Sequence, residues 1–150
     1  MVELDDIDFR LLEVLRNKGR IPMSSLADAV GIGRATTYNR LEKLRASGVL
    51  EGFSAQVNAE RIGLGISAFI EVSTQQPQLS KFIDEIKDMP QIQYAARVTG
   101  GQDVLLLVRV PDIATLRDGI LDRLHALPMV SGLRTFLILQ EIVRHPYVLP

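Results

Sequence analysis

The chain has 150 residues, of which 47% are hydrophobic and 23% are charged. This composition is typical of a globular protein with a real core and excludes a disordered chain. The sequence contains no cysteine, which excludes disulfides and thiolate metal sites and fits a cytoplasmic protein. The sequence contains no run of about 18 apolar residues, so no membrane span is predicted. The acidic segment Met1–Asp8 does not resemble a signal peptide.

The formal net charge of −1 argues mildly against a DNA-binding protein, since such proteins are often basic. The local distribution of charge is different. From Arg34 to Arg45 there are four basic residues and one acid, Glu42. Because ionic screening makes nearby charges dominate, one basic helix is sufficient for contact with phosphate groups.

The N-terminal third of the chain predicts three helices, since apolar residues recur there at helical spacing. They are expected at residues 3–18, about 23–30 and 34 to about 47. Asp5 is the expected N-cap of the first helix, and a Gly-Ile-Gly turn at residues 31–33 separates the last two. Three helices with a tight glycine turn before the last are typical of a helix-turn-helix.

The second half of the chain predicts the order strand–helix–strand twice. Alternation of Ile66, Ala68, Ile70 and Val72 with other residues indicates the first strand. The other elements are expected at residues 58–63 (a turn or one helical turn), 79–90 (helix), 92–99 (strand), 100–103 (hairpin turn), 104–110 (strand), 113–127 (helix) and 130–141 (strand). This order predicts a ferredoxin-like βαββαβ domain, so the whole chain is expected to be α+β.

The strand at 104–110 is apolar at nearly every position, so we expect it to be covered on both faces. Right-handed crossovers place both helices of the domain on one face of the antiparallel sheet. No further helix is predicted to cover the other face. A second subunit is therefore expected to bury it, which makes a homodimer a physical inference.

The predicted domains follow from these elements. Residues 1–50 form the helix-turn-helix domain, 51–63 an extended linker, 64–141 the ferredoxin-like domain and 142–150 a C-terminal tail. The tail is apolar and contains two prolines, and we expect it to pack on a neighbouring subunit or to fray.

Motifs in order along most of the chain resemble the Lrp/AsnC ("feast/famine") family of regulators. In the N-terminal half they are Leu4-Asp5-Asp6-Ile7-Asp8, Gly19-Arg20-Ile21, Leu26-Ala27, Val30-Gly31, Arg40-Leu41-Glu42-Lys43-Leu44, Gly48-Val49-Leu50 and Gly52-Phe53. In the C-terminal half they are Gly100-Gly101-Gln102-Asp103 and Leu127-Pro128-Met129-Val130, which leads into the strand of Thr135. Each motif alone is weak, whereas their order and spacing together are specific.

The resemblance implies a winged-helix-like helix-turn-helix and a dimer built through the ferredoxin-like domains, often with four dimers in an octamer. It also implies an amino-acid effector, bound between dimers near the glycine–aspartate turn. The chain is thus expected to be a transcriptional regulator and not an enzyme, with no cofactor, and to act in the cytoplasm on double-stranded DNA.

The third helix is then the expected recognition helix, whose side chains reach base edges in the major groove. Arginine pairs with guanine, asparagine pairs with adenine, and threonine contacts thymine methyl or phosphate groups. The expected DNA-contacting residues are Gly33, Arg34, Thr36, Thr37, Asn39, Arg40 and Lys43. The alternative for the whole set is a solvated polar face.

Two residues of this helix have competing interpretations. Arg40 lies further along the helix, so it is equally able to form an ion pair with Asp6 or Asp8 of the first helix. Tyr38 is interpreted as a core residue, since its spacing to Leu41 and to Leu44 is helical.

Around the glycine–aspartate turn, backbone N–H groups are suited to a carboxylate and an acid is suited to an ammonium group. An amino-acid zwitterion needs both. The expected effector-binding residues are Thr99, Gly100, Gly101, Gln102, Asp103 and Thr135. The alternative is a hairpin in which Asp103 caps the backbone of its own turn.

Other functions are less well supported by the sequence. The glycine pairs lack the third glycine of a dinucleotide site and the Gly-Lys-Ser/Thr of a P-loop, and the only two histidines, His125 and His145, have no acid or cysteine at metal-ligand spacing. Sirohaem decarboxylases resemble the same family and typically carry a His-Asn-Tyr motif, where this chain reads Tyr94-Ala95-Ala96. An architectural DNA-binding protein without an effector remains a second alternative.

Overall fold

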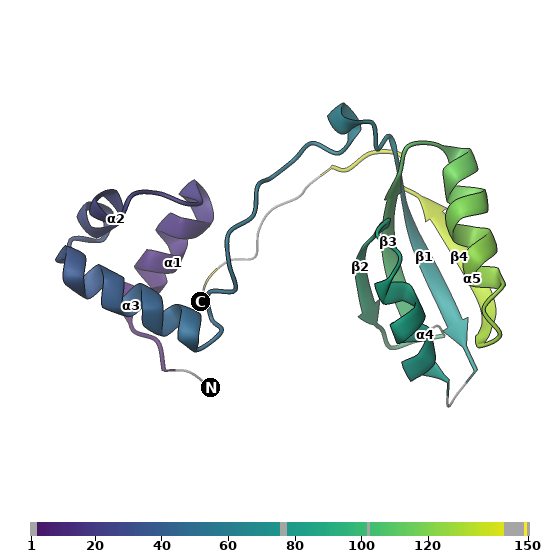
Figure 1. Cartoon of the computed structure of the whole chain (residues 1–150), viewed down its shortest axis with the longest axis horizontal. Helices are drawn as coiled ribbons and strands as arrows, with labels where there is room; N and C mark the ends of the chain where they lie inside the picture. Colours follow the sequence, from purple (N-terminus) through teal and green to yellow (C-terminus); the bar gives the residue numbers. More distant parts are fainter. Residues whose placement is uncertain (1–2, 76–77, 102, 143–148, 150) are drawn as a thin grey trace. The chain divides into compact units, whose positions relative to one another are not determined.

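The structure, a computed structural model, describes residues 3–75, 78–101, 103–142 and 149. The chain divides into two compact units (Figure 1), the first containing residues 3–56 and the second residues 57–142. The first is helical and the second is a sheet with helices, which confirms the predicted α+β class. Gln102 and residues 143–148 and 150 of the predicted tail lie outside the described residues.

The N-terminal unit contains the three predicted helices. They are α1 (Asp6–Lys18), α2 (Met23–Val30) and α3 (Arg34–Ala46), and α1 begins three residues after its predicted start at residue 3. The predicted N-cap is confirmed, because the carboxylate of Asp5 accepts hydrogen bonds from the backbone N–H groups of Ile7 and Asp8, both at 3.0 Å. Apolar side chains of all three helices, including Leu11, Leu26 and Leu44, form one buried cluster.

The turn between α2 and α3 depends on a glycine. Gly31 has φ 76 in the left-handed region, a conformation that is costly for a residue with a Cβ atom. Its backbone N–H donates to the carbonyl of Ala27 and ends α2. Two residues later, Gly33 has extended backbone angles and begins α3 without a side-chain cap.

The buried face of α3 differs from the predicted one. Thr37, Leu41 and Leu44 face the interior, whereas Tyr38 is 55% exposed, so its assignment to the core is wrong. Thr37 is 0% exposed, and its burial is tolerated because its hydroxyl donates to the carbonyl of Gly33 at 3.0 Å and needs no partner from solvent. A small threonine thus takes the place that the spacing suggested for the tyrosine.

The C-terminal unit is a four-stranded antiparallel sheet in the order β2-β3-β1-β4. Its elements are η1 (Glu60–Ile62), β1 (Ile66–Thr74), α4 (Leu79–Lys87), β2 (Ile92–Arg97), β3 (Val104–Val110), the π-helical segment η2 (Thr115–Leu121), α5 (Asp122–His125) and β4 (Val130–Leu137). The predicted βαββαβ order is confirmed. The last strand ends at Leu137, four residues before the predicted end at residue 141.

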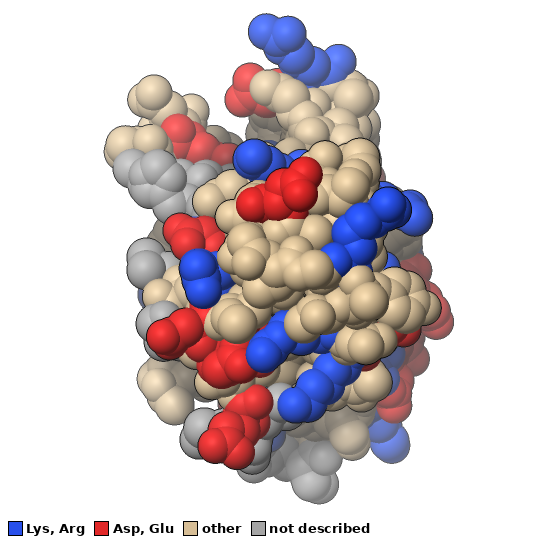
Figure 2. Space-filling view, turned by 90° about the vertical axis from the view of Figure 1, so that its left-hand side faces the viewer, with Lys and Arg blue, Asp and Glu red and all other residues tan. Residues whose placement is uncertain are grey.

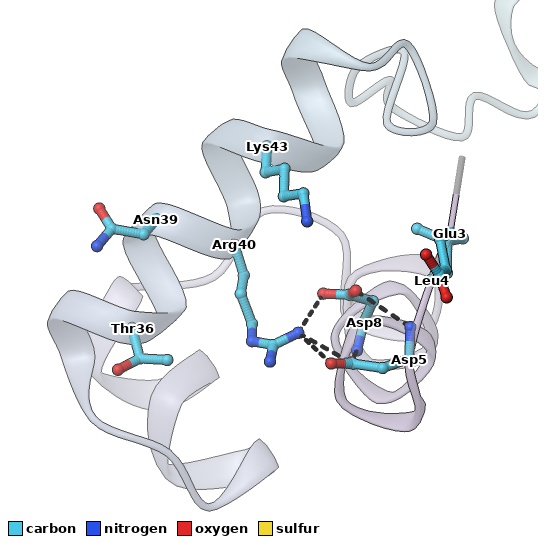
Figure 3. A pocket seen from close by; sticks show the side chains of 8 residues that line it. All are labelled: Glu3, Leu4, Asp5, Asp8, Thr36, Asn39, Arg40 and Lys43. Atoms are coloured by element: carbon cyan, nitrogen blue, oxygen red, sulfur yellow. Dashed lines mark hydrogen bonds and ion pairs between the residues drawn. The ribbon is translucent and has the colours of Figure 1, made fainter. Parts of the chain in front are cut away.

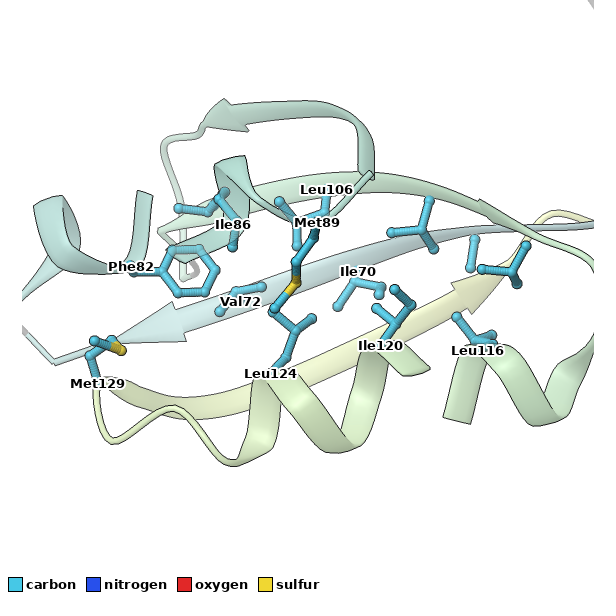
Figure 4. Close-up of a cluster of buried hydrophobic side chains, with 14 residues drawn as sticks. Ile70, Val72, Phe82, Ile86, Met89, Leu106, Leu116, Ile120, Leu124 and Met129 are labelled. Atoms are coloured by element: carbon cyan, nitrogen blue, oxygen red, sulfur yellow. The ribbon is translucent and has the colours of Figure 1, made fainter. Parts of the chain in front are cut away.

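Both helices pack on the same face of the sheet. Figure 4 shows Phe82 and Ile86 of α4 with Ile120 and Leu124 of η2 and α5, which point toward the central strand. These side chains meet every second residue of β1 and β3, including Ile70, which is completely buried. The period of two along each strand therefore places one row of side chains in the core and the other on the opposite face.

Within the described residues of the C-terminal unit the opposite face of the sheet carries no helix, so the expected cover of β3 on both faces is found on one face only. One row of paired residues crosses all four strands there: Tyr94, Leu107, Phe69 and Phe136. Tyr94 is 56% exposed, Phe69 38% and Phe136 45%. We call these four residues the open-face row.

The reassigned face of α3 can be tested by the free energy of unfolding. Leu41→Ala removes a buried side chain and should cost about 2–5 kcal/mol. Tyr38→Ala alters an exposed side chain and should cost no more than about 0.5 kcal/mol. Urea unfolding followed by circular dichroism measures both, and equal losses for the two variants would return Tyr38 to the core.

Candidate nucleic-acid interface and effector site

The exposed surface of α3 has two neighbouring stripes. Thr36, Asn39 and Lys43 are exposed and lie on one side of the helix, since residues three and four apart share a face. Arg34 and Tyr38, also exposed, lie four residues apart on the adjoining side. Both stripes offer hydrogen-bond donors to the surroundings of the helix.

The stripe of Thr36, Asn39 and Lys43 borders an open depression of ≈ 610 Å³. Figure 3 shows these three side chains on α3, with Glu3, Leu4 and Asp5 on the segment that leads into α1. Cationic and hydrogen-bonding groups thus line one wall of the depression and acidic groups line the other. The mixed charge distinguishes this surface from a uniformly basic one.

Arg40 is held in ion pairs. Its Nη1 donates to Oδ1 and Oδ2 of Asp5, each at 2.8 Å, and to Oδ1 of Asp8 at 2.9 Å. Of the competing interpretations, ion pairing with Asp8 is present, and the second partner is Asp5 and not Asp6. Hydrogen bonding to Asp8 and then to Asp5 raises the pKa of Arg40.

The members of the predicted DNA-contacting set differ in exposure. Gly33 and Arg34 are exposed at the start of α3. Thr37 is buried, so its side chain does not reach the surface and we leave it out of the proposed interface. Tyr38, predicted in the core, is instead exposed on the adjoining side, because apolar spacing alone does not distinguish a buried residue from its neighbour.

The N-terminal unit carries both signs of charge on its surface. Figure 2 shows Lys and Arg side chains in a loose band across this side of the molecule, next to a group of Asp and Glu side chains. On α3 itself, Nη1 of Arg45 lies 3.6 Å from Oε1 of Glu42. Cζ of Arg45 lies 5.9 Å from the ring centre of Phe53. Arg34 and Lys43 are the cations of α3 for which no such partner is seen among the described residues.

The turn between β2 and β3 is anchored to the end of β1. Oδ2 of Asp103 accepts from the backbone N–H of Thr74 at 2.6 Å and from its hydroxyl at 3.0 Å. The backbone hydrogen bond is the largest cause that lowers the pKa of Asp103, so its carboxyl group stays ionised at neutral pH. The carboxylate therefore holds a neighbouring strand, and no bond from it to the described residues of its own turn is seen.

The other predicted effector residues are only partly brought together. Thr99, Gly100 and Gly101 are exposed in the same turn as Asp103, while Gln102 lies outside the described residues. Thr135 lies on β4 and pairs with Ile70, two strands away from β3, which is about 10 Å across the sheet. Within one chain Thr135 is therefore not part of the turn.

No group of three or more His, Asp or Glu side chains among the described residues is placed to hold a metal ion. No helix in the same part of the chain has the length and apolar character to cross a membrane.

Comparison with protein families gives two matches. Residues 4–51 match a winged helix-turn-helix DNA-binding model, and residues 67–148 match the Lrp/AsnC ligand binding domain. Among similar proteins, the HTH-type transcriptional regulator AldR of Mycolicibacterium smegmatis is 36% identical over 93% of this chain and 84% of its own length. The Bkd operon transcriptional regulator of Pseudomonas aeruginosa is 30% identical over 95% of each chain.

Among solved structures, the L-Met complex of a transcriptional regulator from Neisseria meningitidis is similar over 99% of this chain and 97% of that chain. Its TM-score is 0.90 and its sequence identity is 27%. The similarity thus extends over both the helical unit and the sheet.

Proposed function

Because this chain belongs to the Lrp/AsnC family of transcriptional regulators, we propose that it binds specific DNA sequences through α3 and responds to an amino acid. Its relatives are helix-turn-helix regulators with a ligand-binding domain. The proposal adds to that description the contacting residues, the effector class and the assembly. It includes no enzymatic activity, and we expect the protein to act in the cytoplasm.

The observation that supports DNA binding is the exposed stripe of Thr36, Asn39 and Lys43 on a helix fixed by a glycine turn and a buried inner face. Asparagine pairs with adenine through two hydrogen bonds, and lysine contacts phosphate as a point charge. Arg34 at the start of α3 is suited to guanine, because N-terminal residues of a recognition helix reach the base edges. A dimer would read two half-sites about 34–36 Å apart.

The contacts of Asn39 and Lys43 have different signatures. Asn39→Ala should cost about 1–3 kcal/mol on the cognate duplex and relax the preference at one base pair, since it removes a base contact. Lys43→Ala should weaken binding to all duplexes about equally and reduce the salt slope by about 1. Fluorescence anisotropy at several salt concentrations, on a site found by genomic selection, measures both effects.

Arg10→Ala provides the matched control for these variants, because Arg10 is an exposed cation of the same unit on α1. It should leave affinity and salt slope close to those of the wild type. If the Asn39 and Lys43 variants bind as the wild type does while folded, α3 is not the DNA-contacting helix.

We further propose that a second copy of the chain covers the open-face row. The row is aromatic and aliphatic, and polar groups lie on both sides of it. On one side Arg134 lies 3.4 Å from Glu71. On the other, Arg109 donates to Gln93 at 2.6 Å and to Ser67 at 2.9 Å. An apolar centre with a polar rim is typical of protein interfaces. We propose that the resulting dimers assemble further into an octamer.

The dimer can be tested by charge. Phe69→Glu puts a carboxylate at the centre of the open-face row and should convert the assembly to single chains, because an unpaired charge is costly at a buried interface. Ile113→Glu is the control, since Ile113 is 51% exposed and lies outside the row. Light scattering after gel filtration measures the mass, and an unchanged mass for Phe69→Glu would contradict the proposed interface.

The proposed effector site is the turn that contains Asp103. An ionised carboxylate held in place by Thr74 is suited to an ammonium group, and backbone N–H groups of the exposed residues Gly100 and Gly101 are suited to a carboxylate. The relative from Neisseria meningitidis was solved with L-Met, which supports an amino acid as the ligand class. Thr135 would belong to this site only if another copy of the chain supplied it.

Ligand binding can be tested with the twenty amino acids, L-methionine included. We expect a few of them to raise the melting temperature, and Asp103→Ala should abolish the rise because it removes the partner of the ammonium group. Asp112→Ala is the matched control, since Oδ1 of Asp112 accepts from the N–H of Thr115 at 2.7 Å. It also loses a backbone hydrogen bond but should keep the ligand-induced rise.

The outcome of this screen also decides between two candidate functions. The bonds from Thr74 already give the Asp103 carboxylate a structural role, which favours an architectural DNA-binding protein without an effector. If no amino acid raises the melting temperature, or if Asp103→Ala keeps the rise, the turn is not the effector site.

A further inference from the structure

Three carboxylate oxygens converge on one nitrogen of Arg40. Nη1 lies 2.8 Å from each oxygen of Asp5 and 2.9 Å from Oδ1 of Asp8. In Figure 3 the guanidinium group reaches across from α3 to the first turn of α1, away from the stripe of Thr36 and Asn39. The side chain is 27% exposed, so most of its surface is covered by the protein itself.

The same carboxylates also form the beginning of α1. Asp5 accepts from the backbone N–H groups of Ile7 and Asp8, and Oδ2 of Asp8 accepts from the N–H of Asp5 at 3.3 Å. The backbone bond from Asp8 and the side-chain bond from Arg40 are the largest causes that lower the pKa of Asp5. The hydrogen bonds of the cap thus hold Asp5 and Asp8 in place even without Arg40, and Arg40 binds to this existing pair.

Asp8 is the member of this group that most needs a cation. Its side chain is 9% exposed, against 54% for Asp5. A buried carboxylate is costly unless it is paired and hydrogen-bonded. Arg40 supplies the counter-charge, and moving Arg40 to a base or a phosphate would leave the charge of Asp8 uncompensated.

Arg40 lies four residues after Thr36 and three before Lys43, so it shares a side of α3 with the proposed DNA-contacting stripe. Fixing Arg40 on α1 therefore fixes the rotation of that stripe about the helix axis. We propose that Arg40 is a positioning residue, which locks the recognition helix onto the cap of α1, and that Asp5 and Asp8 act in DNA binding through it.

This role rests on the proposed function. It predicts an effect on DNA affinity opposite to the one that charge alone would give. DNA is a polyanion, so removal of an acid near the interface should strengthen binding. If the acid holds Arg40 and thereby the helix, its removal weakens binding instead. Asp6 is the matched acid, because it is exposed in the same first turn and shares no ion pair with Arg40 in the described structure.

The experiment compares Asp8→Asn, Asp6→Asn and Arg40→Ala in the full chain, at a temperature where melting curves show each to be folded. Asp8→Asn and Arg40→Ala should each weaken binding to the cognate duplex by about tenfold and lower the ratio of cognate to random-sequence affinity. The double variant should lose no more than Arg40→Ala alone, since Arg40→Ala already removes the bond to Asp8 together with the two bonds to Asp5. Asp6→Asn should bind as the wild type or more tightly.

Three results would overturn the proposal. One is an Asp8→Asn variant that binds as tightly as the wild type or more tightly. Another is an Arg40→Ala variant that loses its preference at a single base pair, which is the signature of a base contact. A role in stability alone would leave the affinity ratio of the folded variants unchanged, and that result also counts against positioning.

A melting cycle without DNA separates this proposal from the proposed function. Arg40→Ala, Asp8→Ala and their combination should lower the melting temperature by amounts that do not add, which shows coupling between the two side chains. Arg40→Lys should recover part of the loss, because lysine keeps the charge but not the planar guanidinium. Additive losses would overturn the proposed positioning role of Arg40. A wild type that binds no DNA would overturn the proposed function, and the melting cycle would still test the coupling between Arg40 and Asp8.

Discussion

The register between β1 and β3 sets the arrangement of the whole C-terminal unit. Ile70 pairs with Leu106 on the helix-covered face, and Phe69 pairs with Leu107 on the open face. Because side chains alternate with a period of two, a shift of one residue would exchange the two faces. The same register brings the end of β1 to Asp103, so the core, the open-face row and the anchored turn all follow from one pairing.

In the N-terminal unit, α3 also has one buried face and exposed faces, but side-chain burial and an ion pair determine them instead of a strand register. Thr37, Leu41 and Leu44 bury one face of α3, and the other faces are exposed except where Arg40 turns toward α1. Threonine is tolerated in the interior because its hydroxyl is satisfied within its own helix. Burial on one side and an ion pair on the other together determine which side chains of α3 are available to DNA.

Local signals in the sequence were sufficient for most of the fold. Asp5 and the glycine turn at residues 31–33 predicted helix ends correctly, and the alternation in β1 predicted its buried face. Tyr38 was misplaced because spacing to Leu41 and Leu44 does not distinguish it from Thr37, which is smaller and bonds to its own backbone. The contact of Asp103 with Thr74 spans 29 residues, and only the strand register places those two residues together.

The pairing of Arg40 also changes how the charge of this chain is distributed. Of the four basic residues between Arg34 and Arg45, Arg40 is neutralised by Asp5 and Asp8, and Arg45 lies near Glu42. Arg34 and Lys43 are left, so α3 as the proposed recognition helix would release few counterions from DNA and would bind weakly by itself. Two helix-turn-helix units tethered by the proposed sheet dimer would raise each other's effective concentration at a palindromic site. A chain of net charge −1 can then bind DNA through assembly and not through a large positive field.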